Sequence, residues 1–142
     1  MSEVRPARDA AEVDAALALR YDVFCVEQGV SLAEERDGFD DQALHLVVVD
    51  DGEVVGTCRL VAHGTEVKLG RMAVAPTHRG RGLAAELLIE ADARAHELHA
   101  RRIALAAQLS AQALYERAGY APYGNVFLDA GIEHVMMGKA LE

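Results

Sequence analysis

A glycine-rich basic turn between a strand pattern and a helix pattern limits what this chain can fold into. The turn lies in the stretch APTHRGRGLAAELL, residues 75–88. Residues Lys68–Ala75 (KLGRMAVA) read as a strand, and apolar positions recur at helical spacing from Gly82 to Leu98. Gly80 and Gly82 stand where the helix is about to begin, although glycine there costs roughly 0.5–1 kcal/mol relative to alanine. A bare backbone is therefore required at this turn.

The turn predicts an anion-binding site. The first N–H groups of a helix have no partner within the helix, and the helix dipole makes that end positive. A phosphate approaches these groups where no side chain covers them, and Arg79 and Arg81 can add charge-assisted contacts. A plain basic turn is the alternative, because the stretch has neither the GxxxxGK[ST] pattern nor the GxGxxG pattern of nucleotide-binding loops.

The remaining patterns predict one domain over residues 1–142, since no repeat or linker divides the chain. Asp51-Gly52 predicts a tight hairpin turn. The predicted strands are Ser2–Ala7, His45–Asp50, Glu53–Leu60, Lys68–Ala75, Arg101–Gln108, Ala121–Leu128 and His134–Leu141, and the predicted helices are Asp9–Val26, a short one opened by Ser31–Glu34, Gly82–Leu98 and Ser110–Ala118. This order predicts an α/β (α+β) fold, with a mixed, mostly antiparallel sheet of about six to seven strands flanked by about four helices.

Composition and charge exclude several classes of protein. No apolar run approaches the roughly 20 residues of a membrane span, and the N-terminus lacks the apolar core of a signal peptide. Cys25 and Cys58 have no CxxC or zinc spacing, so we expect reduced thiols, a cytoplasmic location and no metal site. Residues 1–53 hold 14 acidic and 4 basic side chains, whereas residues 54–142 hold 9 and 10. The acidic front argues against nucleic acid; it either favours a cationic partner or serves solubility alone.

Two motifs in the second half of the chain resemble those of the GNAT N-acetyltransferases. The stretch RGRGLA (residues 79–84) resembles the family motif (Q/R)xxGx(G/A), and the strand before it resembles the family's central strand. The stretch QLSAQALYERAGY (residues 108–120) resembles NxxAxxxYxxxG(F/Y), with Gln108 in place of the usual Asn. The stretches LRYDVFCVEQGV, ERDGFDDQALHL and GIEHVMM extend the resemblance to the ElaA-like subgroup over nearly the whole chain.

The resemblance implies an acetyl-CoA-dependent N-acetyltransferase with the GNAT fold and a small-molecule or peptide amine as acceptor. In that family the glycine-rich loop holds the pyrophosphate of coenzyme A, and a bulge in the central strand supplies a backbone N–H to the thioester oxygen. The implied coenzyme A ligands are Met72, Ala73, Val74, Arg79, Gly80, Arg81, Gly82, Leu83, Ala84, Gln108, Ser110 and Tyr115.

Two further hypotheses on function stay open beside this one. A fainter likeness of the front part to autoinducer synthases leaves room for a longer acyl donor. A coenzyme A-binding module without catalysis is the non-enzymatic alternative. A homodimer is compatible with all of them.

The implied reaction requires groups that move protons. Tyr115 stands where the family places its general acid, and a phenol with a pKa near ~10 can donate to the departing thiolate. The attacking amine must lose a proton, and Glu27, His45 and His134 are the candidate bases or relay residues. The alternative for Tyr115 is packing on its helix, and the alternative for either histidine is a structural hydrogen bond.

An acidic run follows the first predicted helix. Its carboxylates are those of Glu34, Glu35, Asp37, Asp40 and Asp41. The run either attracts a cationic amine toward the acceptor site or forms a solvated loop.

Overall fold

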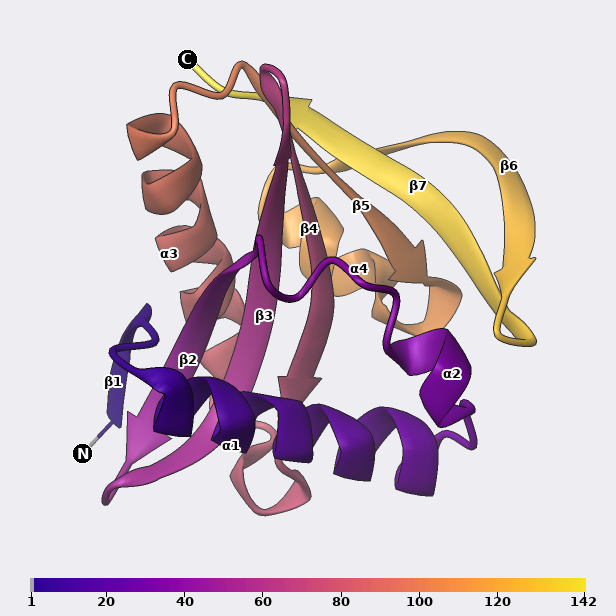
Figure 1. Cartoon of the computed structure of the whole chain (residues 1–142). Helices are drawn as coiled ribbons and strands as arrows, with labels where there is room; N and C mark the ends of the chain where they lie inside the picture. The colour runs from indigo at the N-terminus through magenta and orange to yellow at the C-terminus, as the bar shows by residue number, and fades with distance from the viewer. Residues whose placement is uncertain (1) are drawn as a thin grey trace.

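Seven strands of the protein join in one twisted sheet in the computed structural model, which describes residues 2–142 (Figure 1). The strands are β1 (Ser2–Pro6), β2 (Leu44–Asp50), β3 (Glu53–His63), β4 (Glu66–Val74), β5 (Arg102–Gln108), β6 (Ala121–Asp129) and β7 (Ile132–Ala140). Their order across the sheet is β1-β2-β3-β4-β5-β7-β6. Neighbouring strands are antiparallel except β4 and β5, which are parallel. The predicted mixed sheet is confirmed; Met1 lies outside the described residues.

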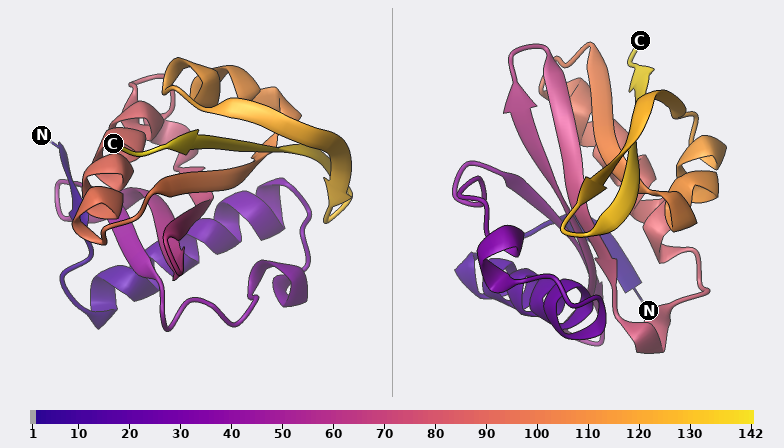
Figure 2. Two further views of the ribbon diagram at one scale, coloured as in Figure 1. Left: turned by 90° about the horizontal axis from the view of Figure 1, so that it is seen from above. Right: turned by 90° about the vertical axis from the view of Figure 1, so that its right-hand side faces the viewer.

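Helices cover both faces of this sheet. They are α1 (Ala10–Arg20), a π-helical segment (Tyr21–Glu27) that continues it, α2 (Leu32–Glu35), α3 (Leu83–Glu97) and α4 (Gln112–Arg117), with short 3-10 turns at Pro76–His78 and Leu109–Ala111. Helix α1 lies across one face, whereas α3 and α4 lie on the opposite face (Figure 2). None of the helices formed by residues 2–142 has the length and apolar content required to cross a membrane.

Local signals in the sequence explain where most of these elements begin and end. The Asp9 side chain accepts a hydrogen bond from the Glu12 N–H and so caps α1. Both residues of the β2–β3 turn, Asp51 and Gly52, have a positive φ (50° and 78°), as the predicted hairpin requires. Helix α3 buries Leu83, Leu87, Leu88, Ala91 and Ala95 against the sheet. This apolar stripe fixes the N-terminus of α3 beside the end of β4.

The first helix changes its winding at Tyr21, which the apolar periodicity did not predict. The expected α-helix over Asp9–Val26 is α-helical to Arg20 and π-helical from Tyr21 to Glu27. A π-helical turn rotates the following side chains relative to an α-helix and often marks a functional site. Here Val23 and Glu27 lie along the cleft described below.

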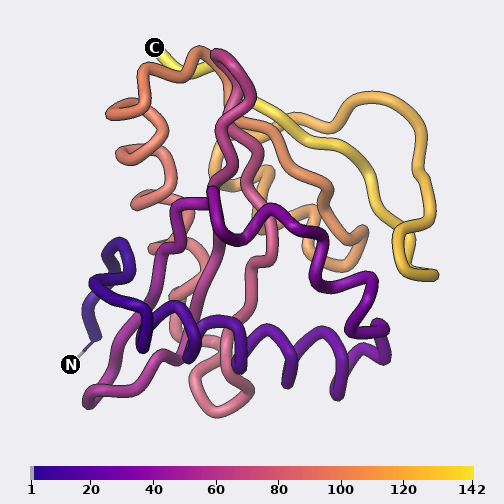
Figure 3. Tube along the Cα trace, viewed as in Figure 1, coloured from indigo at the N-terminus to yellow at the C-terminus, as the bar shows by residue number. Residues whose placement is uncertain are grey.

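The segment between α2 and β2 crosses the face of β3 and β4 on the α1 side of the sheet (Figure 3). It contains most of the acidic run. Hydrogen bonds from β3 and β4 arginines hold it there, so it does not extend into solvent.

Candidate active site

Strands β4 and β5 part from each other and open a cleft in the middle of the sheet. They pair in parallel where Glu66–Lys68 meets Arg102–Ala104, and beyond these residues they diverge (Figure 1). A cavity of about 920 Å³ occupies the gap and also borders α4, the π-helical segment and the segment between α2 and β2. Within the described chain, the edge of β4 beyond Lys68 therefore offers its peptide groups to a ligand instead of to a strand.

A β-bulge distorts β4 beside this cleft. Thr57 of β3 pairs with Ala73, whereas Arg59 pairs with Gly70, so β4 has one residue more than β3 between the two pairs. Arg71, inside the bulge, has a left-handed backbone with φ of 53°. The family resemblance implies a bulge in this strand, and the structure has one.

The alternation of the backbone shows which peptide groups of β4 face the cleft. The Ala75 N–H donates to the Val55 carbonyl oxygen on β3 at 2.8 Å. The peptide N–H and carbonyl of Val74 therefore point away from β3, toward the cleft, and Met72, next to the bulge, also lines the cleft. In agreement, the Val74 carbonyl oxygen accepts a hydrogen bond of 3.0 Å from Arg79 Nε.

The N-terminus of α3 is built differently from those of α1 and α2. Asp9 and Ser31 cap α1 and α2 through their side chains. Gly82, the N-cap of α3, has no side chain to do so and adopts a φ of 78°. A Cβ atom added to Gly80 or Gly82 would meet no other atom within 4 Å. Free N–H donors facing open space suit an anion, and they fit the pyrophosphate of coenzyme A.

A groove between α3 and α4 connects this helix end with the cleft. It encloses about 620 Å³ and shares Val74, Arg79 and Leu114 with the cleft. Ile89 and Arg117 also line it. No sequence pattern assigned a ligand role to Leu114, Ile89 or Arg117, because ordinary helical spacing does not reveal that α3 and α4 flank a groove. Together the groove and the cleft can hold one elongated ligand.

Tyr115 of α4 lines the cleft and is otherwise enclosed. The residue is 6% exposed, and its ring packs edge-on against the ring of Tyr120, with 6.1 Å between the ring centroids. Burial, with a smaller contribution from the neighbouring Cys58, raises the pKa of Tyr115 to about 12. The phenol is therefore protonated at neutral pH and can donate a hydrogen bond into the cleft.

His134 of β7 also lines the cleft. Its Nδ1 lies 2.7 Å from the Ile132 carbonyl oxygen, which can only accept, so Nδ1 carries the proton of the neutral ring. Nε2 is then the acceptor. Stacking on Phe127 at 5.8 Å between ring centroids holds the ring in this orientation.

His45, the other candidate histidine, lies away from the cleft. It is 6% exposed, and its Nε2 donates to the Asp40 carbonyl oxygen at 2.9 Å. The structural alternative therefore fits His45, because the hydrogen bond ties β2 to the acidic run. The sequence could not distinguish the two histidines, since both stand near the start of a strand.

Glu27 lines the cleft in an ion pair with Arg79. Arg79 Nη1 and Nη2 donate to the two Glu27 carboxylate oxygens at 2.8 and 2.7 Å. The hydrogen bonds from Arg79 hold the pKa of Glu27 below its ordinary value. Glu27, a candidate base, and Arg79, a candidate phosphate ligand, are thus paired with each other. Both side chains are substantially exposed.

The other predicted coenzyme A residues fall into two groups. Met72, Ala73, Gln108 and Ser110 line the cleft, and Leu83 and Ala84 line the groove. Arg81 is exposed and borders neither cavity. Gln108, which replaces the usual Asn, donates to Gln28 Oε1 at 2.9 Å and so joins β5 to the end of the first helix.

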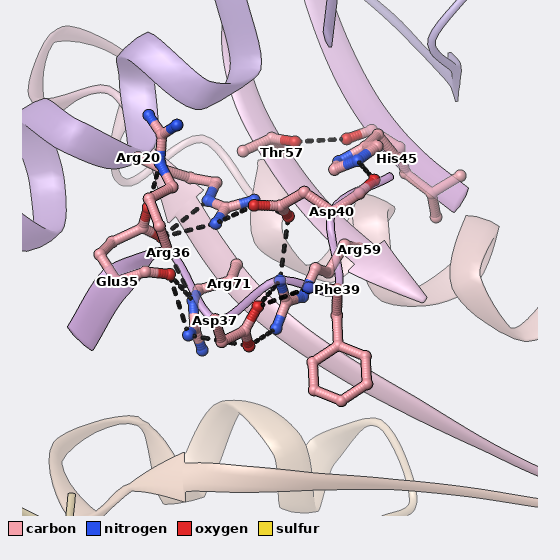
Figure 4. Close-up of polar contacts among 11 residues, drawn as sticks. Arg20, Glu35, Arg36, Asp37, Phe39, Asp40, His45, Thr57, Arg59 and Arg71 are labelled. Atoms are coloured by element: carbon pink, nitrogen blue, oxygen red, sulfur yellow. Dashed lines mark hydrogen bonds and ion pairs between the residues drawn. The ribbon is translucent and has the colours of Figure 1, made fainter. Parts of the chain in front are cut away.

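The acidic run forms a network with arginines from three elements (Figure 4). Arg20 of α1 is 1% exposed and donates to Glu35 at 2.8 Å and to Asp40 at 2.6 Å. Arg59 of β3 donates to Asp37 at 2.8 Å and to Asp40 at 2.9 Å. Charge-assisted hydrogen bonds of this kind are stronger than neutral ones.

This network changes the interpretation of the acidic run as a collector of cations. Three of its five carboxylates, those of Glu35, Asp37 and Asp40, face guanidinium groups. These three carboxylates are already paired with arginines, so they no longer support the hypothesis that the acidic run attracts a cationic acceptor. One signal was present in the sequence: Arg20 stands on the apolar face of a helix, and a buried guanidinium needs a carboxylate partner.

Comparisons with known proteins identify the family. Residues 9–141 match the family described as "Acetyltransferase (GNAT) domain". The chain is 32% identical over 134 residues to the uncharacterized N-acetyltransferase YjcF of Bacillus subtilis, covering 94% of this chain and 96% of that one. An acyl-CoA N-acyltransferase from Pseudomonas aeruginosa superposes with a TM-score of 0.86 at 31% identity, over 99% of both chains. Escherichia coli ElaA has the same fold, with a TM-score of 0.85 at 24% identity over 98% of both chains. The protein belongs to the GNAT acetyltransferase family.

Proposed function

We propose that this protein is an acetyl-CoA-dependent N-acetyltransferase that acts on a small-molecule or peptide amine. One observation carries the proposal: two adjoining cavities, which share Val74, Arg79 and Leu114, lie between the uncapped N-terminus of α3 and the free edge of β4 beside Tyr115. A ligand with an anionic end and a thioester end matches the two ends of this pair of cavities. The relatives named as N-acetyltransferase and acyl-CoA N-acyltransferase support the same reaction.

The residues that would hold acyl-CoA follow from the donors on each side. The first N–H groups of α3, at Leu83 and Ala84, would bind the pyrophosphate next to Gly80 and Gly82. The cleft-facing peptide groups of β4 would bind the thioester end.

The reaction divides among backbone, tyrosine and histidine. Acyl-CoA supplies the acyl group as a thioester; the amine nitrogen bonds to the acyl carbon while the C–S bond breaks. The Met72 N–H would stabilise the negative charge on the carbonyl oxygen. Tyr115, with a pKa of about 12, would hold the departing sulfur by a hydrogen bond. Full proton transfer is less favourable because an ordinary thiol has a pKa of about 8.5. Before the attack, the ammonium group of the acceptor passes one proton to His134 Nε2; after the C–N bond forms, the nitrogen releases its second proton to solvent, and solvent protonates the thiolate.

His134→Gln should lower kcat/KM for the amine roughly tenfold at neutral pH. This is less than the usual effect of a general base, because water in an open cleft can accept the proton instead. The loss should shrink as pH rises toward the ordinary pKa of an alkylamine, about 10.4, since an amine that is already uncharged needs no deprotonation before it attacks. Initial rates across that pH range test this, with His45→Gln as the control. A loss that stays constant with pH would assign His134 a structural role.

Gly82→Val should raise the Kd for acetyl-CoA at least tenfold, or ~1.4 kcal/mol. The side chain would cover the N–H donors of α3, and the left-handed backbone disfavours a β-branched residue. Gly52→Val is the matched control, because Gly52 has the same φ of 78° but lies in the β2–β3 turn. Calorimetry should find weaker binding in the first variant alone. Equal affinity in both folded variants would remove the α3 terminus as the anion site.

Glu27→Gln should tighten acetyl-CoA binding by up to about fivefold. An exposed ion pair is weak, and the substitution frees Arg79 for the anion without the need to break that pair. The matched control is Glu97→Gln, which neutralises an exposed carboxylate at the far end of α3. Titration of each variant with acetyl-CoA at low ionic strength shows whether the affinity rises or falls. Weaker binding in Glu27→Gln would show that Arg79 does not exchange its partner for the ligand.

The proposed function itself is tested with isotope-labelled acetyl-CoA and a panel of amines that are cationic, neutral or acidic apart from the amino group. Label in an amide product supports N-acetyl transfer and identifies the acceptor class. A parallel series with longer acyl-CoA donors measures acyl preference. Binding of acetyl-CoA without transfer to any amine would favour the non-catalytic alternative.

A further inference from the structure

The bulge in β4 places an arginine where a glycine would fit with less strain. Arg71 has a φ of 53°, whereas the adjacent Gly70 does not have a positive φ. Non-glycine residues rarely adopt this conformation, and they keep it only where the surroundings hold it. The contacts of the Arg71 side chain can therefore help to stabilise the bulge.

These contacts reach across the cleft wall to α2 and the segment after it. Arg71 Nε and Nη2 donate to the Glu35 carbonyl oxygen at 3.2 and 3.1 Å, and Nη2 donates to Asp37 Oδ2 at 3.2 Å. Nε also lies 3.2 Å from Glu35 Oε2. One guanidinium thus joins the bulge to both the backbone and the carboxylates of the acidic run.

The partners of Arg71 are themselves held in place (Figure 4). The Glu35 carboxylate is buried and pairs with Arg20 of α1. Asp37 pairs with Arg59 of β3 through both of its carboxylate oxygens. The bulge is therefore fastened to an ionic network anchored in a helix and in the neighbouring strand, and such networks are rigid when their members are satisfied.

Arg71 directly precedes the peptide group that carries the Met72 N–H, the proposed donor to the thioester oxygen. The peptide between Arg71 and Met72 carries the Met72 N–H, Met72 lines the cleft, and the proposed function assigns this N–H to the thioester oxygen. Rotation about the Arg71 backbone would turn this donor. A donor must stay aligned with the oxygen that gains charge in order to stabilise the transition state.

We propose that Arg71 is a positioning residue that fixes the Met72 N–H by clamping the β4 bulge to the segment between α2 and β2. The acidic run then serves as the frame of this clamp. The inference rests on the proposed function, in which the Met72 N–H polarises the thioester carbonyl.

Two variants of Arg71 and one matched control test the clamp. Arg71→Gly keeps the left-handed backbone without strain but removes the guanidinium, and Arg71→Lys keeps one positive charge. Arg36→Gln is the control, because Arg36 donates to the same Glu35 carboxylate at 3.0 Å without belonging to β4. Acetyl-CoA labelled with ¹³C at the thioester carbonyl is bound to each protein without an amine, and infrared difference spectra record the carbonyl stretch.

The clamp predicts a specific pattern of results. The wild-type protein and Arg36→Gln should lower the carbonyl frequency relative to free acetyl-CoA. Arg71→Gly should lose most of this shift, and its kcat should fall about tenfold while the Kd for acetyl-CoA stays within about twofold. Arg71→Lys should be intermediate, and it provides the readout if the glycine variant does not fold.

Three outcomes would overturn the inference, and they are distinguishable. A wild-type protein that neither binds acetyl-CoA nor shifts its carbonyl frequency would reject the proposed function together with the clamp. A wild-type shift that persists in Arg71→Gly or Arg71→Lys would reject the clamp alone. Equal losses in Arg36→Gln and the Arg71 variants would show that the network is merely structural.

Discussion

Replacing Tyr115 with phenylalanine should lower kcat on the order of 10²-fold while leaving acetyl-CoA binding nearly unchanged. Tyr115 of α4 lines the cleft, and the proposed function assigns its phenol as the donor to the departing sulfur. A hydrogen bond to a sulfur that becomes anionic strengthens as the C–S bond breaks, so its loss affects the transition state more than the bound ground state.

The fold should tolerate this substitution. Tyr115 belongs to the main apolar cluster, and phenylalanine keeps the ring and its edge-on contact with Tyr120. Across residues 2–142, no side-chain hydrogen bond involves the Tyr115 hydroxyl, so its removal leaves no partner unsatisfied. Circular dichroism and thermal unfolding should therefore match the wild-type protein.

Tyr120→Phe is the matched control for Tyr115→Phe. Tyr120 is 3% exposed and does not line the cleft, and its hydroxyl is a buried group without a hydrogen-bond partner among the described residues. Removing such a group is neutral or stabilising, and turnover should not change. Steady-state rates with an accepted amine compare the two variants. Wild-type turnover in Tyr115→Phe would leave Tyr115 with packing alone.

The fold was predictable because its signals are local. The apolar stripe of α3, the Asp51-Gly52 turn and the Ser31–Glu34 start of α2 each act within a few residues and appear in the structure where expected. The structure differs from the predictions where tertiary contacts determine the end or the winding of an element. Strand β3 continues to His63 because β4 pairs with it to that point, and a 3.6-residue periodicity cannot reveal that the first helix becomes π-helical at Tyr21.

The site divides in the same way. The turn at Gly80 and Gly82 is local, so strand, turn and helix patterns located it. Arg59 and Arg71 acquire their roles from partners 19 to 36 residues earlier in the chain, and no spacing rule connects such positions. The charges of the acidic run were visible in the sequence, but their neutralisation depends on which arginines the sheet places beneath them.

Arg20→Met should lower the free energy of unfolding by about 3–5 kcal/mol, because it leaves the buried Glu35 carboxylate without its main counterion. Arg20 and Glu35 are almost completely enclosed and make contacts of 2.7 and 2.8 Å. Asp40 loses two further hydrogen bonds from the same guanidinium. Methionine fills a similar volume, so lost packing contributes little to the change. Denaturant unfolding at neutral pH measures the free energy.

An exposed arginine provides the comparison that separates burial from charge. Arg94 of α3 pairs with Glu90 and Glu97 on the surface, and Arg94→Met should lower the free energy of unfolding much less than Arg20→Met does. If Arg20→Met lowers the free energy of unfolding no more than Arg94→Met does, the buried ion pair stabilises the fold no more than a surface ion pair.

Adding Glu35→Gln to Arg20→Met should recover part of the lost stability, because the second substitution removes the uncompensated charge. Recovery should be incomplete, since Arg36 and Arg71 also bind the Glu35 carboxylate and would lose a charged partner. The double variant should therefore be less destabilised than the sum of the two single variants, by an amount that reports their coupling. Strict additivity would show that Arg20 and Glu35 act independently. Coupling, together with a reduced kcat in Arg20→Met at temperatures where it is folded, would show that the network which stabilises the first helix also maintains the geometry of the β4 bulge.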